Sequence, residues 1–171
     1  MNKIIWFLLA GLWILADQVS KHYAVVELKD KAQIIDVLPV LRWAYAENHG
    51  AAFGLLSDQG GWQKWFFLSI GAIATVLLTI AIIKADKGAF FAPFGYASIL
   101  GGALGNVYDR AVLGYVRDMI SVYYEPINFH FAIFNVADVA ISVGVGALII
   151  DALLTMKRDR AGQKASQQTD N

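Results

Sequence analysis

Four apolar stretches, separated by more polar segments, dominate the pattern of this chain. A stretch of about 20 apolar residues matches the hydrocarbon core of a bilayer. The pattern therefore predicts transmembrane helices at residues 4–26, 65–83, 89–104 and 136–154. Only about 13 residues from Ile4 onward are uniformly apolar, so the first helix must continue through Asp17 and Lys21 to reach spanning length. A cleaved signal peptide fits less well, because Ile14 would occupy a position that requires a small residue.

Two of the polar segments carry strand signals. Residues 34–45 are rich in branched and aromatic side chains that alternate with smaller or charged ones, which predicts a strand. Residues 113–134 are too interrupted to span, because Pro126 breaks them, and Phe129 and Phe131 alternate with polar residues there. We expect a short strand or an interfacial segment at that point. The predicted fold class is membrane α-helical, with four transmembrane helices, a small extracytoplasmic β-sheet and a short outer loop or helix.

The composition agrees with a membrane protein. The chain of 171 residues is 57% hydrophobic, with a mean hydropathy of +0.50, and only 16% of its residues are charged. An ordinary soluble domain is about a quarter charged. The net charge is zero, so no nucleic-acid partner is indicated. No cysteine is present, which excludes a thiol nucleophile, a disulfide framework and a cysteine-ligated metal. We expect one membrane domain over residues 1–156 and a polar, disordered cytoplasmic tail over residues 157–171.

The basic residues indicate the orientation in the membrane. Four spans put both termini on one side, and the short connection between the second and third helices carries Lys84 and Lys87. Lys157, Arg158 and Arg160 follow the last helix directly. Short cytoplasmic loops are where the positive-inside rule is most reliable, so this side is predicted to be cytoplasmic, although the outer segments also carry basic residues.

Two aspartates stand out because each lies beside apolar residues at the outer side of the predicted bundle. These are Asp118 and Asp138. A carboxylate at the edge of a membrane segment is costly and usually has a functional reason. For Asp138 a structural explanation is equally open, because Asn135 and Asp138 are spaced as a helix N-cap and an acid in the first turn.

Further polar residues fall at the same outer ends. Asp17 and Lys21 are four residues apart in the first helix, so they can pair, and a plain interfacial ion pair with a snorkelling lysine would account for them. The convergence of so many polar groups on one side favours a catalytic site. The supporting candidates are Asp17, Lys21, Asn48, Asn106, Arg110 and Asn135.

The residue types limit the chemistry. The three histidines show no metal-ligand spacing, so we expect neither a metal nor another cofactor. Ser20 and Lys21 are adjacent and do not share a helix face, which weakens a serine–lysine dyad. Two aspartates suit peptide hydrolysis: one carboxylate takes a proton from water, and its protonated partner donates to the carbonyl oxygen.

Five blocks carry a resemblance to a known family, and they span the chain from the first helix to the fourth. They are residues 17–21 (DQVSK), 48–54 (NHGAAFG), 101–110 (GGALGNVYDR), 114–120 (GYVRDMI) and 134–138 (FNVAD). With these blocks in this order, the chain resembles lipoprotein signal peptidase (signal peptidase II), the bacterial membrane aspartic peptidase family. His49 stands where threonine is common in the family, and neither His49 nor Arg117 is assigned a role.

The resemblance implies that Asp118 and Asp138 are the catalytic dyad and that the supporting candidates hold the site or contact substrate. It implies a prolipoprotein substrate whose cysteine carries diacylglycerol, with cleavage just before that cysteine. Membrane phospholipid and the cyclic-peptide inhibitors of the family are expected partners, and the oligomeric state stays open. The expected location is the bacterial cytoplasmic (inner) membrane, with the site at its outer face. The outer strands would lie over the membrane like a cradle, and residues 113–134 would act as a lid.

Two other functions stay open from the residues alone. A small transporter would use Asp17, Asp118 and Asp138 as a proton relay, but transport favours acids near the middle of the bilayer rather than at helix ends. A structural protein would use the glycines at positions 101, 102 and 105 for helix pairing. That function leaves both aspartates unexplained.

Overall fold

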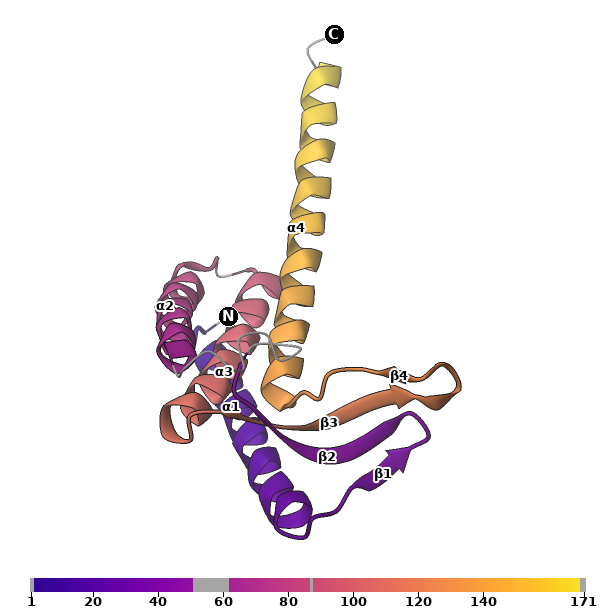
Figure 1. The fold of residues 1–171 in the computed structure, drawn as a ribbon. Helices are drawn as coiled ribbons and strands as arrows, with labels where there is room; N and C mark the ends of the chain where they lie inside the picture. The colour runs from indigo at the N-terminus through magenta and orange to yellow at the C-terminus, as the bar shows by residue number, and fades with distance from the viewer. Residues whose placement is uncertain (1, 51–61, 87, 170–171) are drawn as a thin grey trace.

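Helices and one small sheet make up the fold (Figure 1). The structure is a computed structural model of the 171-residue chain and describes residues 2–50, 62–86 and 88–169. In chain order the elements are α1 (Ile4–Ala24), η1 (Val25–Lys29), β1 (Ile35–Leu38), β2 (Leu41–Asn48), α2 (Trp62–Lys84), α3 (Phe91–Val112), β3 (Val116–Tyr124), η3 (Glu125–Ile127), β4 (Phe129–His130) and α4 (Val136–Thr169).

Among the described residues, three helical segments are long and apolar enough to cross a membrane. They are Ile4–Lys29, Trp62–Lys84 and Val136–Ala161. The fourth predicted span, α3, does not reach this standard of hydropathy. The reason is visible in the packing: α3 lies among α1, α2 and α4 and buries ten of its residues, including Asn106 and Asp109, so it needs a less apolar surface.

Small residues let α3 approach its neighbours closely, as the glycine pattern predicts. A Cβ added at Gly101 would lie 2.7 Å from the carbonyl oxygen of Ala10 in α1. On another face, a Cβ at Gly102 would lie 2.3 Å from the carbonyl oxygen of Ala137 in α4. Within a bilayer the hydrophobic effect does not drive helices together, so close backbone contacts of this kind help them to associate. The positions of α1 and α4 on α3 are therefore fixed by glycine.

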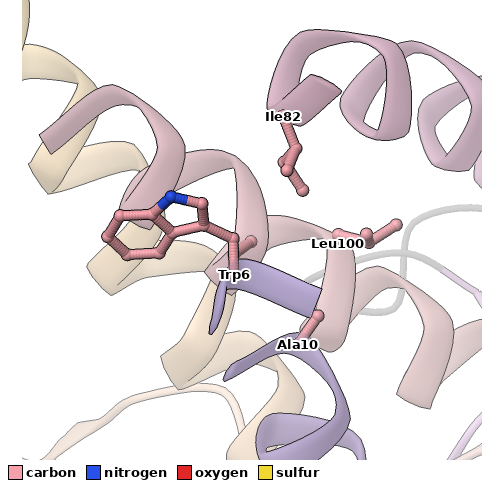
Figure 2. Packing of buried hydrophobic residues seen from close by; sticks show 5 residues of the cluster. Trp6, Ala10, Ile82 and Leu100 are labelled. Carbon is pink, nitrogen blue, oxygen red and sulfur yellow. The ribbon is translucent and has the colours of Figure 1, made fainter. Parts of the chain in front are cut away.

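A hydrophobic cluster ties α1 and α2 to α3 away from the sheet. Figure 2 shows Trp6 and Ala10 of α1 beside Leu100 of α3 and Ile82 of α2. Ile82 is completely buried and Leu100 is 3% exposed. A second cluster of Ala24, Leu28 and Met119 packs the end of α1 against β3, so the sheet is anchored on the first helix.

The sheet has four antiparallel strands in the order β1-β2-β3-β4 and extends sideways from one end of the bundle (Figure 1). The single strand expected at residues 34–45 is instead a hairpin, in which Leu38 pairs with Leu41 around a turn at Pro39. Proline fixes φ and lacks an N–H, so it suits the turn rather than the strand.

Residues 113–134 contain the short strand that was expected near Phe129, which is β4 (Phe129–His130), and a role as a lid stays a prediction. They form β3, the short 3₁₀-helix η3 and β4, and so make up half of the sheet. Nine-residue β3 is the central strand that was not predicted from the sequence. Its charged residues Arg117 and Asp118 hid the strand pattern, because both are taken up by contacts with the bundle rather than facing water.

The fourth helix begins where predicted, at Val136, but runs far beyond the predicted end at residue 154. It continues to Thr169, so the expectation of a disordered tail is wrong for residues 157–169. Those residues contain no proline and are rich in lysine, arginine, alanine and glutamine, which favour helix. The start of α1 and the end of α4 lie on the side of the bundle away from the sheet (Figure 1).

Candidate active site

Asp118 of β3 and Asp138 of α4 come together through a set of asparagine amides. The Nδ2 atom of Asn135 donates to Oδ1 of Asp118 at 2.6 Å, and Nδ2 of Asn48 donates to its Oδ2 at 3.0 Å. The Nδ2 atom of Asn106 donates to Oδ1 of Asp138 at 2.9 Å. Asp118 is 2% exposed, so these amides replace water as its hydrogen-bond partners.

Backbone pairing explains why the two aspartates meet. The N–H groups of Met119 and Ile120 both donate to the carbonyl oxygen of Phe134, and the N–H of Phe134 donates to that of Ile120. This bridge lies between Asp118 in the strand and Asn135 at the start of α4. The sheet and the fourth helix thus join at the point where both carboxylates stand.

The helix-capping explanation for Asp138 is also realised. The N–H of Asp138 donates to Oδ1 of Asn135 at 3.0 Å, and the N–H of Asn135 donates to Oδ2 of Asp138 at 3.2 Å. This is a reciprocal capping box. The other carboxylate oxygen of Asp138, Oδ1, accepts a hydrogen bond from Asn106, and Asp138 lines a cavity. Capping therefore orients Asp138 and leaves it at the wall of the cavity.

The environment of Asp118 changes its proton affinity. Burial raises the pKa of Asp118 to about 6, and the charge of Asp138 raises this pKa as well. The amides of Asn48 and Asn135 act in the opposite direction, because they stabilise the ionised carboxylate. A carboxyl group with a pKa near 6 can hold or release a proton close to neutral pH, which is what acid–base catalysis needs.

A cluster of charges lies directly beneath this pair. Lys21 is completely buried, and its Nζ contacts Oδ2 of Asp17 at 2.8 Å and Oδ2 of Asp109 at 3.3 Å. The expected i,i+4 pair of Asp17 and Lys21 is present, whereas the snorkelling lysine is ruled out by burial. Lys21 also donates to Oδ1 of Asn106 at 3.0 Å, which turns the Nδ2 atom of that amide toward Asp138.

Asp17 connects the cluster to the fourth helix. Its Oδ1 accepts the backbone N–H of Ala137 at 2.9 Å, in the first turn of α4. A Cβ at Gly105 would lie only 2.5 Å from Oδ2 of Asp17, so glycine is required where α3 passes this carboxylate. Asp17 of α1 thus holds the first turn of α4, which lines the cavity.

Arg110 contacts the outer segment rather than the charge cluster. Its Nη2 donates to the carbonyl oxygen of Gly50 at 3.0 Å, and its guanidinium lies 4.7 Å from the centre of the Phe67 ring. Asn106 and Arg110, predicted to share a helix face, both line the same cavity. Residues 51–54 of the second sequence block lie outside the described residues.

The cavity has a volume of about 530 Å³ and two chemically different parts. Its polar end holds Asn48, Asn106, Arg110 and Asp138. The rest is formed mainly by apolar residues of α4 and of the segment that precedes it: Val116, Phe131, Ala132, Ile133, Phe134, Val139, Ile141, Ser142 and Val143. A ligand that fills this cavity must carry both a polar group and a large apolar part.

Comparison with known proteins decides the family. Residues 9–154 match the family model described as Signal peptidase (SPase) II. The chain belongs to the signal peptidase II family. It is 43% identical to the lipoprotein signal peptidase of Acinetobacter baumannii over 92% of this chain and 88% of that protein. It is 37% identical to the lipoprotein signal peptidase of Shewanella loihica over 90% of this chain and 88% of that protein.

Solved structures agree with this membership. One described as a bacterial membrane enzyme has a TM-score of 0.78 at 30% identity and covers 90% of each chain. A second with the same description has a TM-score of 0.72 at 31% identity, over 87% of this chain and 92% of that chain. With three helices of spanning character, this signal peptidase II family member is a multi-pass membrane protein.

The structure places the residues predicted for the site at the cavity or in the polar network beside it, and it adds three residues that were not predicted. Asp109, Arg117 and Gln18 belong to the charge cluster. Asp109 stands three residues after Asn106 on α3, so helical spacing was an available signal. Arg117 and Gln18 gave none, because their contacts depend on how β3 returns across the ends of α1 and α3.

Proposed function

We propose that this chain is a membrane-embedded aspartic endopeptidase that removes signal peptides from diacylglyceryl-modified prolipoproteins, cleaving just before the lipidated cysteine. One observation carries the proposal. Asp138 lines a cavity whose wall is mainly apolar, and the buried Asp118 is joined to the same network of three asparagine amides. A lipid-bearing peptide presents the same two parts, and membership of the signal peptidase II family supports this substrate class.

In the proposed reaction, Asp118 and Asp138 share one proton. The ionised carboxylate takes a proton from a water molecule, whose oxygen attacks the carbonyl carbon of the scissile peptide bond. The protonated partner gives its proton to the carbonyl oxygen, so a tetrahedral diol forms without a free oxyanion. In the collapse of the diol the C–N bond breaks, the proton held by the dyad passes to the leaving amine, and one diol hydroxyl gives its proton to the ionised carboxylate, so the dyad again holds one proton.

The remaining site residues keep this pair in place. Asn48, Asn106 and Asn135 fix the rotamers of the two carboxylates through their amides. Asp17 and Lys21 orient Asn106 and the first turn of α4. Arg110 faces the cavity and holds the outer segment at Gly50, where it can also contact the substrate.

We further propose the arrangement in the membrane. Four spans, with the sheltered α3 as the fourth, put both termini in the cytoplasm and the site at the outer face of the bacterial cytoplasmic membrane. The last part of α4 lies on the side away from the sheet (Figure 1), and it carries Lys157 and Arg158, in agreement with the positive-inside rule. Substrate then enters sideways from the lipid, and phospholipid acyl chains or the family's cyclic-peptide inhibitors compete for the same cavity.

The decisive test replaces each aspartate of the dyad. Asp118→Asn and Asp138→Asn keep the size of the side chain and one acceptor oxygen but remove acid–base function, so each should lower cleavage of a lipidated precursor by roughly 10²–10⁴-fold. Because the two act as a unit, the double variant should be barely worse than either single one. Asp36→Asn, on an exposed strand position, is the matched control and should cleave normally.

Cleavage must be compared at equal protein levels in membranes. If Asp138 served only to cap α4, Asp138→Asn would keep near-normal cleavage, since asparagine is tolerated close to a helix start. That result would refute the proposed mechanism. Inhibition of the wild-type enzyme by a metal chelator would refute it as well.

A further inference from the structure

Arg117 immediately precedes Asp118 in β3, and its contacts lie on the bundle side of the strand. Its Nη2 donates to Oδ1 of Asp109 at 2.6 Å and to Oε1 of Gln18 at 2.8 Å. Its Nε and its backbone N–H both donate to Oδ2 of Asp109, at 3.1 Å and 3.0 Å. The side chain is only 13% exposed. One residue thus binds β3 to the ends of α1 and α3.

These contacts complete a balance of buried charge. Asp17 and Asp109 supply two negative charges, and Lys21 and Arg117 supply two positive ones. Asp17, Lys21 and Asp109 are completely buried. Without Arg117, one lysine would have to serve two buried carboxylates, and a net negative charge would remain without compensation in a medium that screens it poorly.

The cluster reaches both members of the dyad. Through the strand backbone, Arg117 fixes the residue that follows it, Asp118. Because Arg117 pairs with Asp109, Lys21 can also donate to Oδ1 of Asn106. The Nδ2 atom of Asn106 in turn donates to Asp138. Loss of Arg117 would let Asp109 draw Lys21 away from Asn106.

We propose that Arg117 is a positioning residue of this peptidase, which holds Asp118 in place and keeps the buried charge beneath the dyad balanced. This inference rests on the proposed function, since it assigns Arg117 a task toward the Asp118–Asp138 pair. Arg117 is not among the residues that line the cavity, and its side chain contacts Asp109 and Gln18 instead.

The charged groups around Asp118 determine in which direction its pKa moves when Arg117 is replaced. Lys21 of α1 lowers its pKa, Asp138 of α4 raises it, and Arg110 of α3 interacts with both aspartates. From β2 and the start of α4, only the neutral amides of Asn48 and Asn135 contact it. An added net negative charge favours the protonated dyad, so it moves the alkaline limb of kcat/KM to higher pH.

The test measures kcat/KM against pH for cleavage of a lipidated precursor. A unit charge within about 10 Å, at an effective dielectric constant of about 20, changes a pKa by on the order of one unit. Arg117→Gln should therefore move the alkaline limb upward by about one pH unit, and Asp109→Asn should move it downward. The double variant Arg117→Gln/Asp109→Asn removes one charge of each sign and should return the limb to the wild-type position.

Two further variants separate charge from shape. Arg117→Lys keeps the positive charge but loses the several N–H donors of the guanidinium group. The alkaline limb of its kcat/KM profile should therefore stay in place while kcat falls several-fold. Arg42→Gln is the matched control, because Arg42 lies on neighbouring β2, pairs with Glu125 at 3.3 Å and stands outside the cluster. Its pH profile should equal that of the wild type.

The outcomes distinguish this inference from the proposed function. An unmoved limb in Arg117→Gln, or a limb that moves the same way in Arg117→Gln and Asp109→Asn, overturns the role of Arg117 while Asp138→Asn remains inactive. Full activity of Asp138→Asn instead overturns the proposed function. If Arg117→Gln does not accumulate in the membrane, an unmoved limb in Asp109→Asn overturns the inference on its own.

Discussion

Asn106 uses both ends of its amide, and charge decides which end faces the dyad. Its Oδ1 accepts from Lys21 and from Asn135, so its Nδ2 is left to donate to Asp138. An ordinary asparagine can flip its amide at little cost, but here a flip would aim a donor at a lysine. A buried ion pair thus has a purpose beyond stability: it fixes a neutral side chain in one orientation.

At the residue scale, Asn48 offers the cleanest test of how the amides tune the dyad. Its donor stabilises the ionised form of Asp118, so Asn48→Ala should raise the pKa of Asp118 further above about 6. The alkaline limb of kcat/KM should then move to higher pH, with lower maximal activity because Asp118 is less well held. A pH series of precursor cleavage measures both effects.

Gln33→Ala, which removes an exposed amide outside the site, is the matched control and should leave the profile unchanged. A limb that stays fixed or moves to lower pH in Asn48→Ala would show that this amide does not stabilise the charged carboxylate.

The spacing of residues in the sequence was enough to predict the contacts of those residues whose partners lie on the same helix or at a neighbouring helix end. The pair Asp17 and Lys21, and the shared face of Asn106 and Arg110, follow from the helical period alone. It was insufficient for Arg117, which looks like an isolated surface charge in the sequence. Its pairing with Asp109 depends on a chain reversal after α3 that no local pattern encodes.

At the scale of elements, α3 carries the architecture although, among the described long helices, it alone lacks a stretch apolar enough for a membrane span. Its glycines accept α1 on one face and α4 on the other, and its polar end supplies three residues to the site and its cluster. Hydropathy predicted its position but not its full extent to Val112, because polar residues inside a helix bundle resemble those of a loop. The strand β3 was missed for a similar reason.

Gly105 is where the packing of these elements is tightest around a charge. Gly105→Ala would place a methyl group 2.5 Å from Oδ2 of Asp17, which must then leave Lys21 or the N–H of Ala137. Overpacking of this kind typically costs about 1–3 kcal/mol. We expect a lower thermal unfolding midpoint in detergent and a clear loss of cleavage.

Gly11→Ala in α1 is the matched control, since a Cβ there meets nothing within 4 Å and alanine favours helix. It should leave stability equal or slightly higher. Equal stability and activity for Gly105→Ala would mean that Asp17 is not held in the observed position.

At the scale of the whole molecule, the absence of native cysteine allows a direct test of orientation. Asp30→Cys, at the exposed end of η1, should react with a membrane-impermeant thiol reagent applied from outside. Ala85→Cys, directly after α2, and Ala161→Cys, in the last part of α4, should react only after the membrane is permeabilised. Ser57, a further candidate on the outer side, lies outside the described residues.

The reverse labelling pattern would place the sheet and the dyad in the cytoplasm and contradict the proposed location. Labelling of Asp30→Cys and Ala161→Cys from the same side would contradict four spans, because α2, α3 and α4 would then cross the membrane between these two positions and place them on opposite sides.

The apolar wall of the cavity, formed largely by Val139, Ile141 and Val143 of α4, also determines how this enzyme meets its substrate. For a substrate that reaches the site through the bilayer, turnover depends on its mole fraction among the membrane lipids and not on its concentration in the buffer. Dilution of vesicles with buffer should leave the initial rate per vesicle unchanged. Fusion of the same vesicles with inert lipid should slow it in proportion to the added area.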